Sequence, residues 1–243
     1  MPAVETATLL RAWEVGEPQP QLQRALTLLA AACPERSADE WARAWIGERD
    51  ARLFALHEEL FGGRFETVAA CPVCGDRLEA GFTTAELGVA DGRVPSDRGR
   101  AVRASGYEVE FRPPTSLDLW DTVGRADQRT ALLGRCIEAA RWDGAEVGVA
   151  ILPDPVVDAV LEGMREADPL ADLQVGLTCG VCGHRWSMTF DIVAYLWSEI
   201  DDWAQGLLRE VHALASAYGW SERDIFALGS SRRRTYLELA NSP

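Results

Sequence analysis

The sequence lacks any apolar run long enough to cross a bilayer. No stretch approaches the roughly 18 uninterrupted apolar residues that identify a membrane-spanning helix, although the chain has 243 residues. Its first residues, Met-Pro-Ala-Val-Glu-Thr, contain no basic segment leading into an apolar one, which is the pattern of a secretory signal. We therefore expect a cytoplasmic protein without a membrane-spanning segment.

The motifs of the common enzyme classes are missing as well. The chain has no glycine-rich phosphate loop, no His-Glu-x-x-His pair and no nucleophile elbow. It contains only three histidines, His57, His184 and His212. Because Cys182 is already placed to bind a metal, a supporting or surface role is expected for the nearby His184. The sequence thus favours a non-enzymatic protein.

Positive charge is also in short supply. Lys and Arg total 24 against 38 Asp and Glu, which gives a formal net charge of −14. Such a charge repels phosphate backbones and weighs against nucleic-acid binding. The hydrophobic content of 47% and charged content of 26% are those of an ordinary globular protein that can bury a core.

Four of the six cysteines repeat one pattern, Cys-x-Val-Cys-Gly-x-Arg-x-x-x-x-Phe, which starts at Cys71 and again at Cys179. A Cys-x-x-Cys turn lets both sulfurs point at one ion, and the following glycine supplies the permissive backbone of the turn. Four thiolates complete the tetrahedral coordination of zinc and leave no position for water. We therefore expect a structural Zn²⁺ bound by Cys71, Cys74, Cys179 and Cys182.

The surroundings of the two cysteine pairs favour a zinc ribbon over a redox site. Thioredoxin-like pairs use the same spacing, normally at the head of a helix, whereas each pair here lies between strand-like runs. About 100 residues separate the pairs, instead of the roughly 15 to 20 of an ordinary ribbon, so the ribbon must carry an insertion. Free or redox-active thiols are the alternative. The expected strands are 65–70, 78–82, 173–178 and 186–190.

Helical periodicity covers most of the remaining chain. Trp41 and Trp45, four residues apart, are expected on one helix face. A strand at 107–111 and a surface loop at 88–100 interrupt the helices. The strongest periodicity occurs at 192–218, before Gly219 and a helix that Ser221 caps. Helices are expected at 22–32, 46–61, 117–123, 128–142, 155–167, 192–218 and 231–239.

These elements predict a mostly helical α+β fold, in which two Cys-x-x-Cys knuckles assemble a zinc-ribbon-like β core. A helical insertion separates the ribbon halves, and helical segments flank them. The expected units are an N-terminal helical region, the first ribbon half, the insertion, the second ribbon half and a C-terminal helical hairpin region, at residues 1–63, 64–87, 88–168, 169–191 and 192–243.

The only dense basic cluster, Arg232 to Arg234, lies in the C-terminal hairpin. A specific DNA-binding protein commonly neutralises on the order of 6 to 10 phosphates, and three arginines beside many carboxylates are few. A docking surface for an acidic protein partner, or a solvated helix face, is therefore favoured over a nucleic-acid site.

The C-terminal segment combines Glu210-Val211-His212-x-Leu214-Ala215-x-x-Tyr218-Gly219 with Trp220-Ser221-Glu222-Arg223-Asp224-Ile225, Leu228 and Arg232-Arg233-Arg234-x-Tyr236-Leu237. Shorter matches occur at 24–32, at 46–53 and in the two cysteine turns. With these residues the chain resembles T4-type baseplate hub assembly proteins, which occur in contractile phage tails and related contractile injection systems. The likeness is firmest over residues 170–240.

The resemblance implies a non-enzymatic protein that helps to build the baseplate hub, or becomes part of it, and that contacts hub and spike proteins. Such a protein would be found in the cytoplasm or within a phage tail-like particle. Partner binding is expected at the residues Trp220, Arg232, Arg233, Arg234 and Tyr236. The alternative function is that of a zinc-ribbon nucleic-acid-binding regulator.

Overall fold

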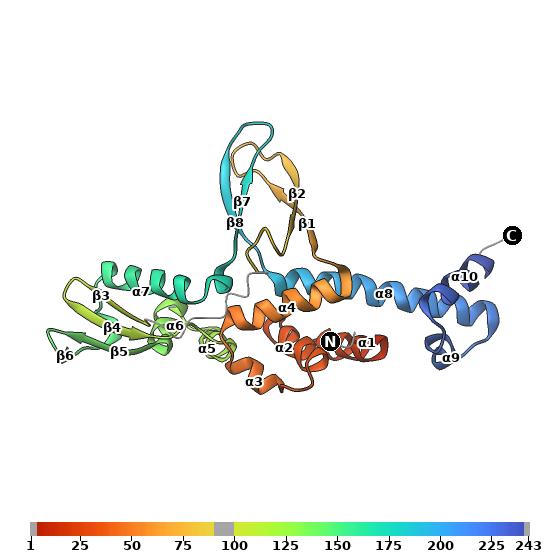
Figure 1. Cartoon of the computed structure of the whole chain (residues 1–243), viewed down its shortest axis with the longest axis horizontal. Coiled ribbons are helices and arrows are strands. Elements are labelled where there is room, and N and C mark those ends of the chain that lie inside the picture. The colour runs from red at the N-terminus through yellow and green to blue at the C-terminus, as the bar shows by residue number, and fades with distance from the viewer. Residues whose placement is uncertain (1–3, 90–99, 241–243) are drawn as a thin grey trace.

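The computed structural model describes residues 4–89 and 100–240 and shows an elongated molecule of four parts (Figure 1). The expected surface loop at 88–100 lies mostly outside the described residues. A helical body occupies the middle, and a hairpin tower, residues 64–83 and 174–189, rises from it. A sheet lobe, residues 101–167, lies at one end of the molecule. A C-terminal lobe, residues 214–240, lies at the other.

The helical body packs four helices against the first half of a fifth. The expected N-terminal helices are confirmed. The expectation that Trp41 and Trp45 share one helix face is wrong, because the short helix α3 ends at Arg43 and Trp45 has the extended backbone of a residue that precedes a helix. The core is built from fully buried leucines such as Leu28, Leu53 and Leu196. The helices are α1 (Thr6–Gly16), α2 (Gln21–Ala32), α3 (Ala38–Arg43), α4 (Ile46–Phe61) and α8 (Ile192–Tyr218).

Helix α1 approaches α8 closely at Gly16, where a Cβ atom would lie 2.6 Å from the Trp197 ring. Arg24 also contacts that ring, with its guanidinium carbon 4.5 Å from the ring centre, and its Nε donates to the Gly16 carbonyl at 3.1 Å. We expect Gly16→Ala to lower the free energy of unfolding by about 1–3 kcal/mol, because the indole must shift within a packed core.

The matched control for this prediction is Gly206→Ala in α8, where an added Cβ meets nothing within 4 Å. Alanine is favoured over glycine inside a helix by about 1 kcal/mol, so this variant should be slightly stabilised. Urea unfolding of both variants measures the difference. Equal stabilities would show that Trp197 does not pack against Gly16 as described.

The sheet lobe holds a four-stranded antiparallel sheet of order β3-β4-β5-β6, with α7 packed on one face (Figure 1). Only β4 was expected. The helix predicted at 128–142 is wrong in its second half, because α6 ends at Cys136 and β5 begins at Ile137. The elements are β3 (Ala101–Ala104), β4 (Tyr107–Phe111), α6 (Gln128–Cys136), β5 (Ile137–Trp142), β6 (Ala145–Glu146), 3₁₀ turn η1 (Val149–Ile151) and α7 (Asp154–Ala167).

Strand pairing overrides helical periodicity at this position for a physical reason. Ile137 and Ala140 are buried beside Val109 and Phe111 of β4 in the lobe core, so the segment gains more by pairing with β4 than by continuing α6. The hairpin turn after β5 is Asp143-Gly144, and both residues have positive φ values, 49° and 81°. That dipeptide is a strong hairpin signal and could have identified the strand from the sequence.

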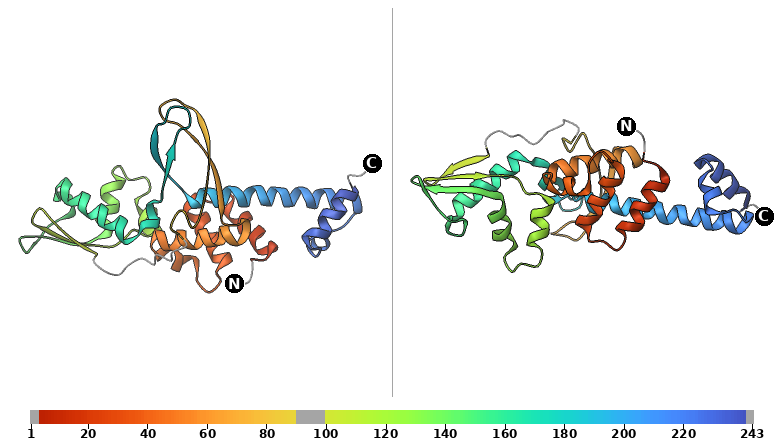
Figure 2. Two further views of the ribbon diagram at one scale, coloured as in Figure 1. Left: turned by 45° about the horizontal axis from the view of Figure 1, so that its top comes forward. Right: turned by 90° about the horizontal axis from the view of Figure 1, so that it is seen from below.

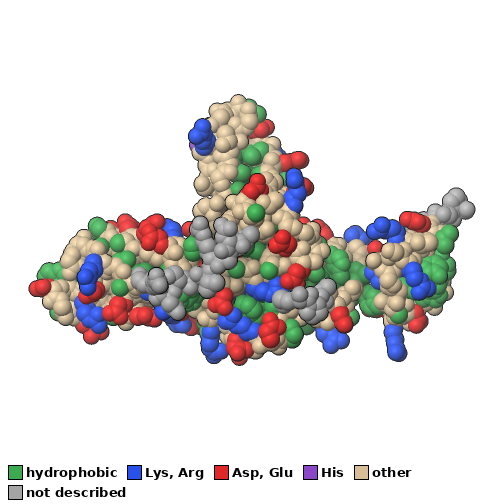
Figure 3. Space-filling view, viewed as in Figure 1, with side chains coloured by type: hydrophobic (Ala, Val, Ile, Leu, Met, Phe, Trp, Pro, Cys, Tyr) green, Lys and Arg blue, Asp and Glu red, His purple; other side chains and the backbone are tan. Residues whose placement is uncertain are grey.

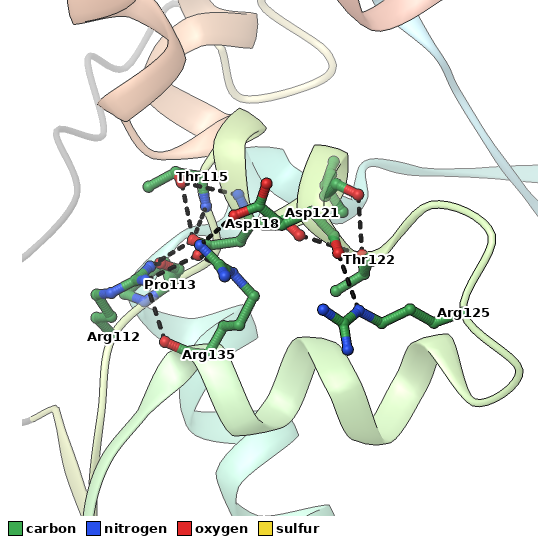
Figure 4. A network of polar contacts seen from close by, with 9 residues as sticks. Arg112, Pro113, Thr115, Asp118, Asp121, Thr122, Arg125 and Arg135 are labelled. Atoms are coloured by element: carbon green, nitrogen blue, oxygen red, sulfur yellow. Dashed lines mark hydrogen bonds and ion pairs between the residues drawn. The ribbon is translucent and has the colours of Figure 1, made fainter.

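A buried carboxylate, Asp118, joins three elements of the sheet lobe (Figure 4). It lies in α5 (Ser116–Thr122), which starts with the expected capping box between Thr115 and Asp118. Arg112 donates two hydrogen bonds to the carboxylate, at 2.6 and 2.9 Å, and Arg135 at the end of α6 donates a third at 2.9 Å. The side chain of Asp118 is 2% exposed. This network fixes the end of β4 to α5 and α6.

The second half of α8 projects beyond the helical body and carries the C-terminal lobe (Figure 2). As expected, Gly219 ends the helix in the left-handed conformation, and the Ser221 side chain accepts a hydrogen bond from the backbone N–H of Asp224. Two short helices, α9 (Glu222–Phe226) and α10 (Ser230–Ala240), complete the lobe. None of the helices in residues 4–89 and 100–240 is long and apolar enough to cross a membrane.

Candidate metal centre

Each half of the hairpin tower is an antiparallel hairpin whose turn carries one cysteine pair, as expected. The two turns have the same backbone pattern. The Cys71 N–H donates to the carbonyl oxygen of Asp76 at 2.8 Å, and the Cys179 N–H donates to that of His184 at 2.9 Å. The glycine after each pair has a positive φ, 75° at Gly75 and 72° at Gly183, which explains why glycine recurs there. The strands are β1 (Arg64–Ala70), β2 (Arg77–Thr83), β7 (Gln174–Thr178) and β8 (Arg185–Thr189).

The two turns bring all four cysteine sulfurs together. The Sγ atoms of Cys71 and Cys182 lie 3.7 Å apart and those of Cys74 and Cys179 lie 3.6 Å apart, so each close pair joins the two hairpins. All four sulfurs lie within 4.8 Å of one another. A disulfide would need about 2.05 Å. Four metal–sulfur bonds of about 2.3 Å in a tetrahedron place the sulfurs roughly 3.8 Å apart, so the cluster fits one metal ion.

An aromatic cluster at the base of the tower holds the hairpins on the helical body. Phe82 and Phe190, the last residues of the two repeated motifs, meet edge to face with ring centres 5.0 Å apart. The fully buried Phe65 of β1 lies 5.6 Å from Phe82 and 5.5 Å from Phe54 of α4. Phe82 and Phe190 therefore anchor their two hairpins to the same hydrophobic core.

His57 of α4 stacks on the same cluster, 4.2 Å from the Phe65 ring centre. It is fully buried, and its Nε2 lies 2.6 Å from a carboxylate oxygen of Glu199 in α8. His57 thus links α4, the tower base and α8, and it lies outside the sulfur cluster.

The local electrostatics give the two thiols of the first cysteine turn different acidities. The backbone N–H of Cys74 donates to the Cys71 sulfur and lowers the pKa of that thiol to about 7. The backbone N–H of Asp76 acts in the same direction on Cys74. Loss of hydration and the neighbouring Cys179 and Cys182 sulfurs outweigh it and raise the pKa of Cys74 to about 12. A cation placed between the sulfurs would favour the thiolate form of both cysteines.

Of the remaining residues singled out from the sequence, His184 belongs to the second cysteine turn but not to the sulfur cluster, and those of the C-terminal lobe lie away from it (Figure 1). The ring of His184 stacks beside Trp186, with 5.9 Å between ring centres. In the C-terminal lobe, Trp220 stacks on Tyr218 at 4.7 Å and meets Tyr236 at 4.9 Å. The signature aromatics thus form one contiguous cluster on the C-terminal lobe.

The three arginines of α10 differ in their surroundings. Arg233 donates to the backbone carbonyl of Leu228 at 2.8 Å and lies 3.5 Å from the Glu210 carboxylate, so it ties α10 to α8. Arg232 and Arg234 are exposed. Only these two arginines of the expected partner-binding set present their charge to solvent.

No protein-family model, curated protein or solved structure matches the chain.

Proposed function

We propose that this protein is a non-enzymatic assembly chaperone or structural component of the baseplate hub in a contractile injection system. The observation that carries the proposal is the arrangement of the residues that resemble the hub assembly family. Tyr236 of α10 forms one aromatic cluster with Tyr218 and Trp220, and Arg233 ties α10 to α8 beside it. The spacing of the pattern corresponds to one structural unit, which supports the proposal.

We also propose that the four cysteines hold one structural zinc ion, in a ribbon whose halves are separated by the sheet lobe. An all-thiolate set is the donor set of structural zinc sites, and tetrahedral coordination by sulfur suits zinc. Because the protein would supply every ligand, the ion would brace the tower and would not activate a substrate. This is the physical basis for a scaffold rather than an enzyme.

The shape and surface of the molecule suit a protein that holds others together. The tower, the sheet lobe and the C-terminal lobe project in different directions, which leaves three separate surfaces for partners (Figure 1). Hydrophobic side chains gather on the C-terminal lobe, where Tyr218 and Leu239 are 37% and 59% exposed (Figure 3). Exposed aromatic and apolar side chains beside arginine are typical of protein interfaces.

Mass spectrometry of purified injection particles, beside the free cytoplasmic pool, tests this function. An assembly component should be found in the particles, or bound to hub or spike proteins before particles form. Affinity capture at several stringencies separates these two cases. Failure to recover the chain in particles and failure to capture any hub or spike protein would together overturn the proposal.

The alternative of a nucleic-acid-binding regulator has one observation in its favour, the capped α9–α10 hairpin with exposed Arg232 and Arg234. Less supports it overall, because Arg233 is engaged by Glu210 and the net charge is −14. We expect no mobility shift of duplex DNA or of RNA even at low ionic strength, where phosphate binding is strongest. A salt-sensitive shift would favour the alternative instead.

A further inference from the structure

A groove of about 620 Å³ lies where the helical body, the sheet lobe and the tower base meet. We name it the junction groove. Apolar side chains from all three parts line it, which places it among concave, mainly apolar sites of ligand-binding size. They include Leu22 and Ile46 of the body, Leu161 and Met164 of the sheet lobe, and Phe190 and Val193 beside the tower base.

Both arginines of the groove are paired with carboxylates, and the exposed Asp191 accepts hydrogen bonds from the Gln21 side chain and the Ala194 N–H. Arg49 and Asp50 pair at 2.7 Å, and Arg165 and Asp172 lie 3.7 Å apart. Asp168, in contrast, is only 3% exposed, and no cationic side chain of the described residues lies within ion-pair distance of it. Its carboxylate accepts a hydrogen bond from the Gly47 N–H at 2.9 Å.

Gly47 lies beside Asp168 and leaves room for its carboxylate. A Cβ atom on Gly47 would lie 1.7 Å from an oxygen of Asp168, so only glycine leaves room for the acid at the start of α4. Burial, with the nearby carboxylates of Asp50 and Glu48, raises the pKa of Asp168 to about 6, against the Gly47 hydrogen bond and the Arg49 charge, which lower it. A buried carboxylate without a counter-ion is costly, and a cation placed beside it would remove much of that cost.

We propose that the junction groove binds an apolar segment of a partner protein that carries one lysine or arginine, with Asp168 as the counter-ion. Charge complementarity selects the cation, since the groove already pairs its own arginines with other carboxylates. The open groove at the meeting of three parts suits a chain segment that enters from solvent. This inference does not rest on the baseplate proposal, because any apolar, basic segment satisfies it.

Met164 provides a direct test, because it lines the groove and Met188, the other methionine in the described residues, does not. Full-length protein labelled with ¹³C at the methionine methyls would be titrated with the blocked peptide Ala-Leu-Lys-Leu-Ala and its Gln counterpart. We expect the Lys peptide to shift the Met164 signal, leave Met188 in place and bind about tenfold more tightly. Equal affinity of the two peptides would overturn the proposal.

Asp168→Asn should reduce the preference for the Lys peptide to about twofold or less, because the amide keeps the Gly47 hydrogen bond and loses the charge. Asp172→Asn, on the same groove but already paired with Arg165, should keep the preference. If Asp168→Asn still prefers the Lys peptide, the cation does not bind at Asp168 and the proposal is overturned. If that variant fails to fold, the comparison of Lys and Gln peptides on the natural protein still decides. If hexylamine binds in the groove and neither peptide does, a protein segment is excluded as the occupant.

Discussion

Replacing Cys74 or Cys182 by serine is expected to abolish stoichiometric metal binding and to unfold or aggregate the protein. Structural zinc contributes apparent free energies of about 10–16 kcal/mol, which is as large as the whole stability of a typical domain. The effect should spread beyond the tower, because Phe65, Phe82 and Phe190 at its base belong to the core of the helical body. Metal analysis and thermal unfolding followed by circular dichroism measure both effects.

If one ion joins the two hairpins, the Cys74 and Cys182 variants should behave alike. Because each close sulfur pair joins the two hairpins, a change in either hairpin should have the same consequence. Val181→Ser is the matched control. It lies in the same turn, is 72% exposed and offers no metal ligand, so it should leave metal content and melting temperature unchanged. Soluble serine variants that melt like the natural protein would contradict a structural role for the cluster.

Asp118→Asn is expected to lower the free energy of unfolding by about 3 kcal/mol at pH 7. Removing one partner of a buried ion pair costs about 3–5 kcal/mol, and the lower end applies because Arg112 and Arg135 are partly exposed and regain water. Asp121→Asn is the control. Asp121 contacts Arg135 at 2.8 Å, but its side chain is 47% exposed, so at most about 1 kcal/mol should be lost. Urea unfolding compares the two variants.

The ionisation of Asp118 also predicts how the free energy of unfolding depends on pH. Burial alone would raise the pKa of its carboxyl, but hydrogen bonds from Arg112, Thr115 and Arg135 outweigh it and hold the pKa well below its ordinary value of 3.8. The folded protein therefore keeps the carboxylate while the unfolded chain takes up a proton. Its contribution is complete at neutral pH and is lost as the pH falls below about 4. In Asp118→Asn this part of the acid sensitivity should disappear. A variant as acid-sensitive as the natural protein would contradict this assignment.

The features that the sequence predicted correctly are those with a local cause. The cysteine turns, their flanking strands and helix α8 depend on residues close together in the chain, such as Gly75, Gly183 and the Ser221 cap. The meeting of two distant cysteine pairs could be predicted as well, because zinc needs four ligands and each turn supplies two. The preference of zinc for four ligands in this way predicted a long-range contact between the cysteine pairs.

The features that were missed depend on the environment of a residue in the folded chain. The segment 137–142 has helical periodicity, and only its pairing with β4 makes it a strand. Asp168 is one of 38 acidic residues, and its burial against Gly47 leaves no mark in the local sequence. The contact of Arg233 with Glu210 likewise could not be predicted from the sequence, in which Arg233 was expected to bind a partner.

Zinc K-edge X-ray absorption of the full-length protein, purified without added metal, tests most directly whether one ion joins the two hairpins. We predict one zinc per chain with four sulfur ligands at about 2.3 Å and no nitrogen or oxygen ligand. A chain without stoichiometric zinc, or a zinc site with only two sulfur ligands, would show that the two cysteine pairs do not share an ion.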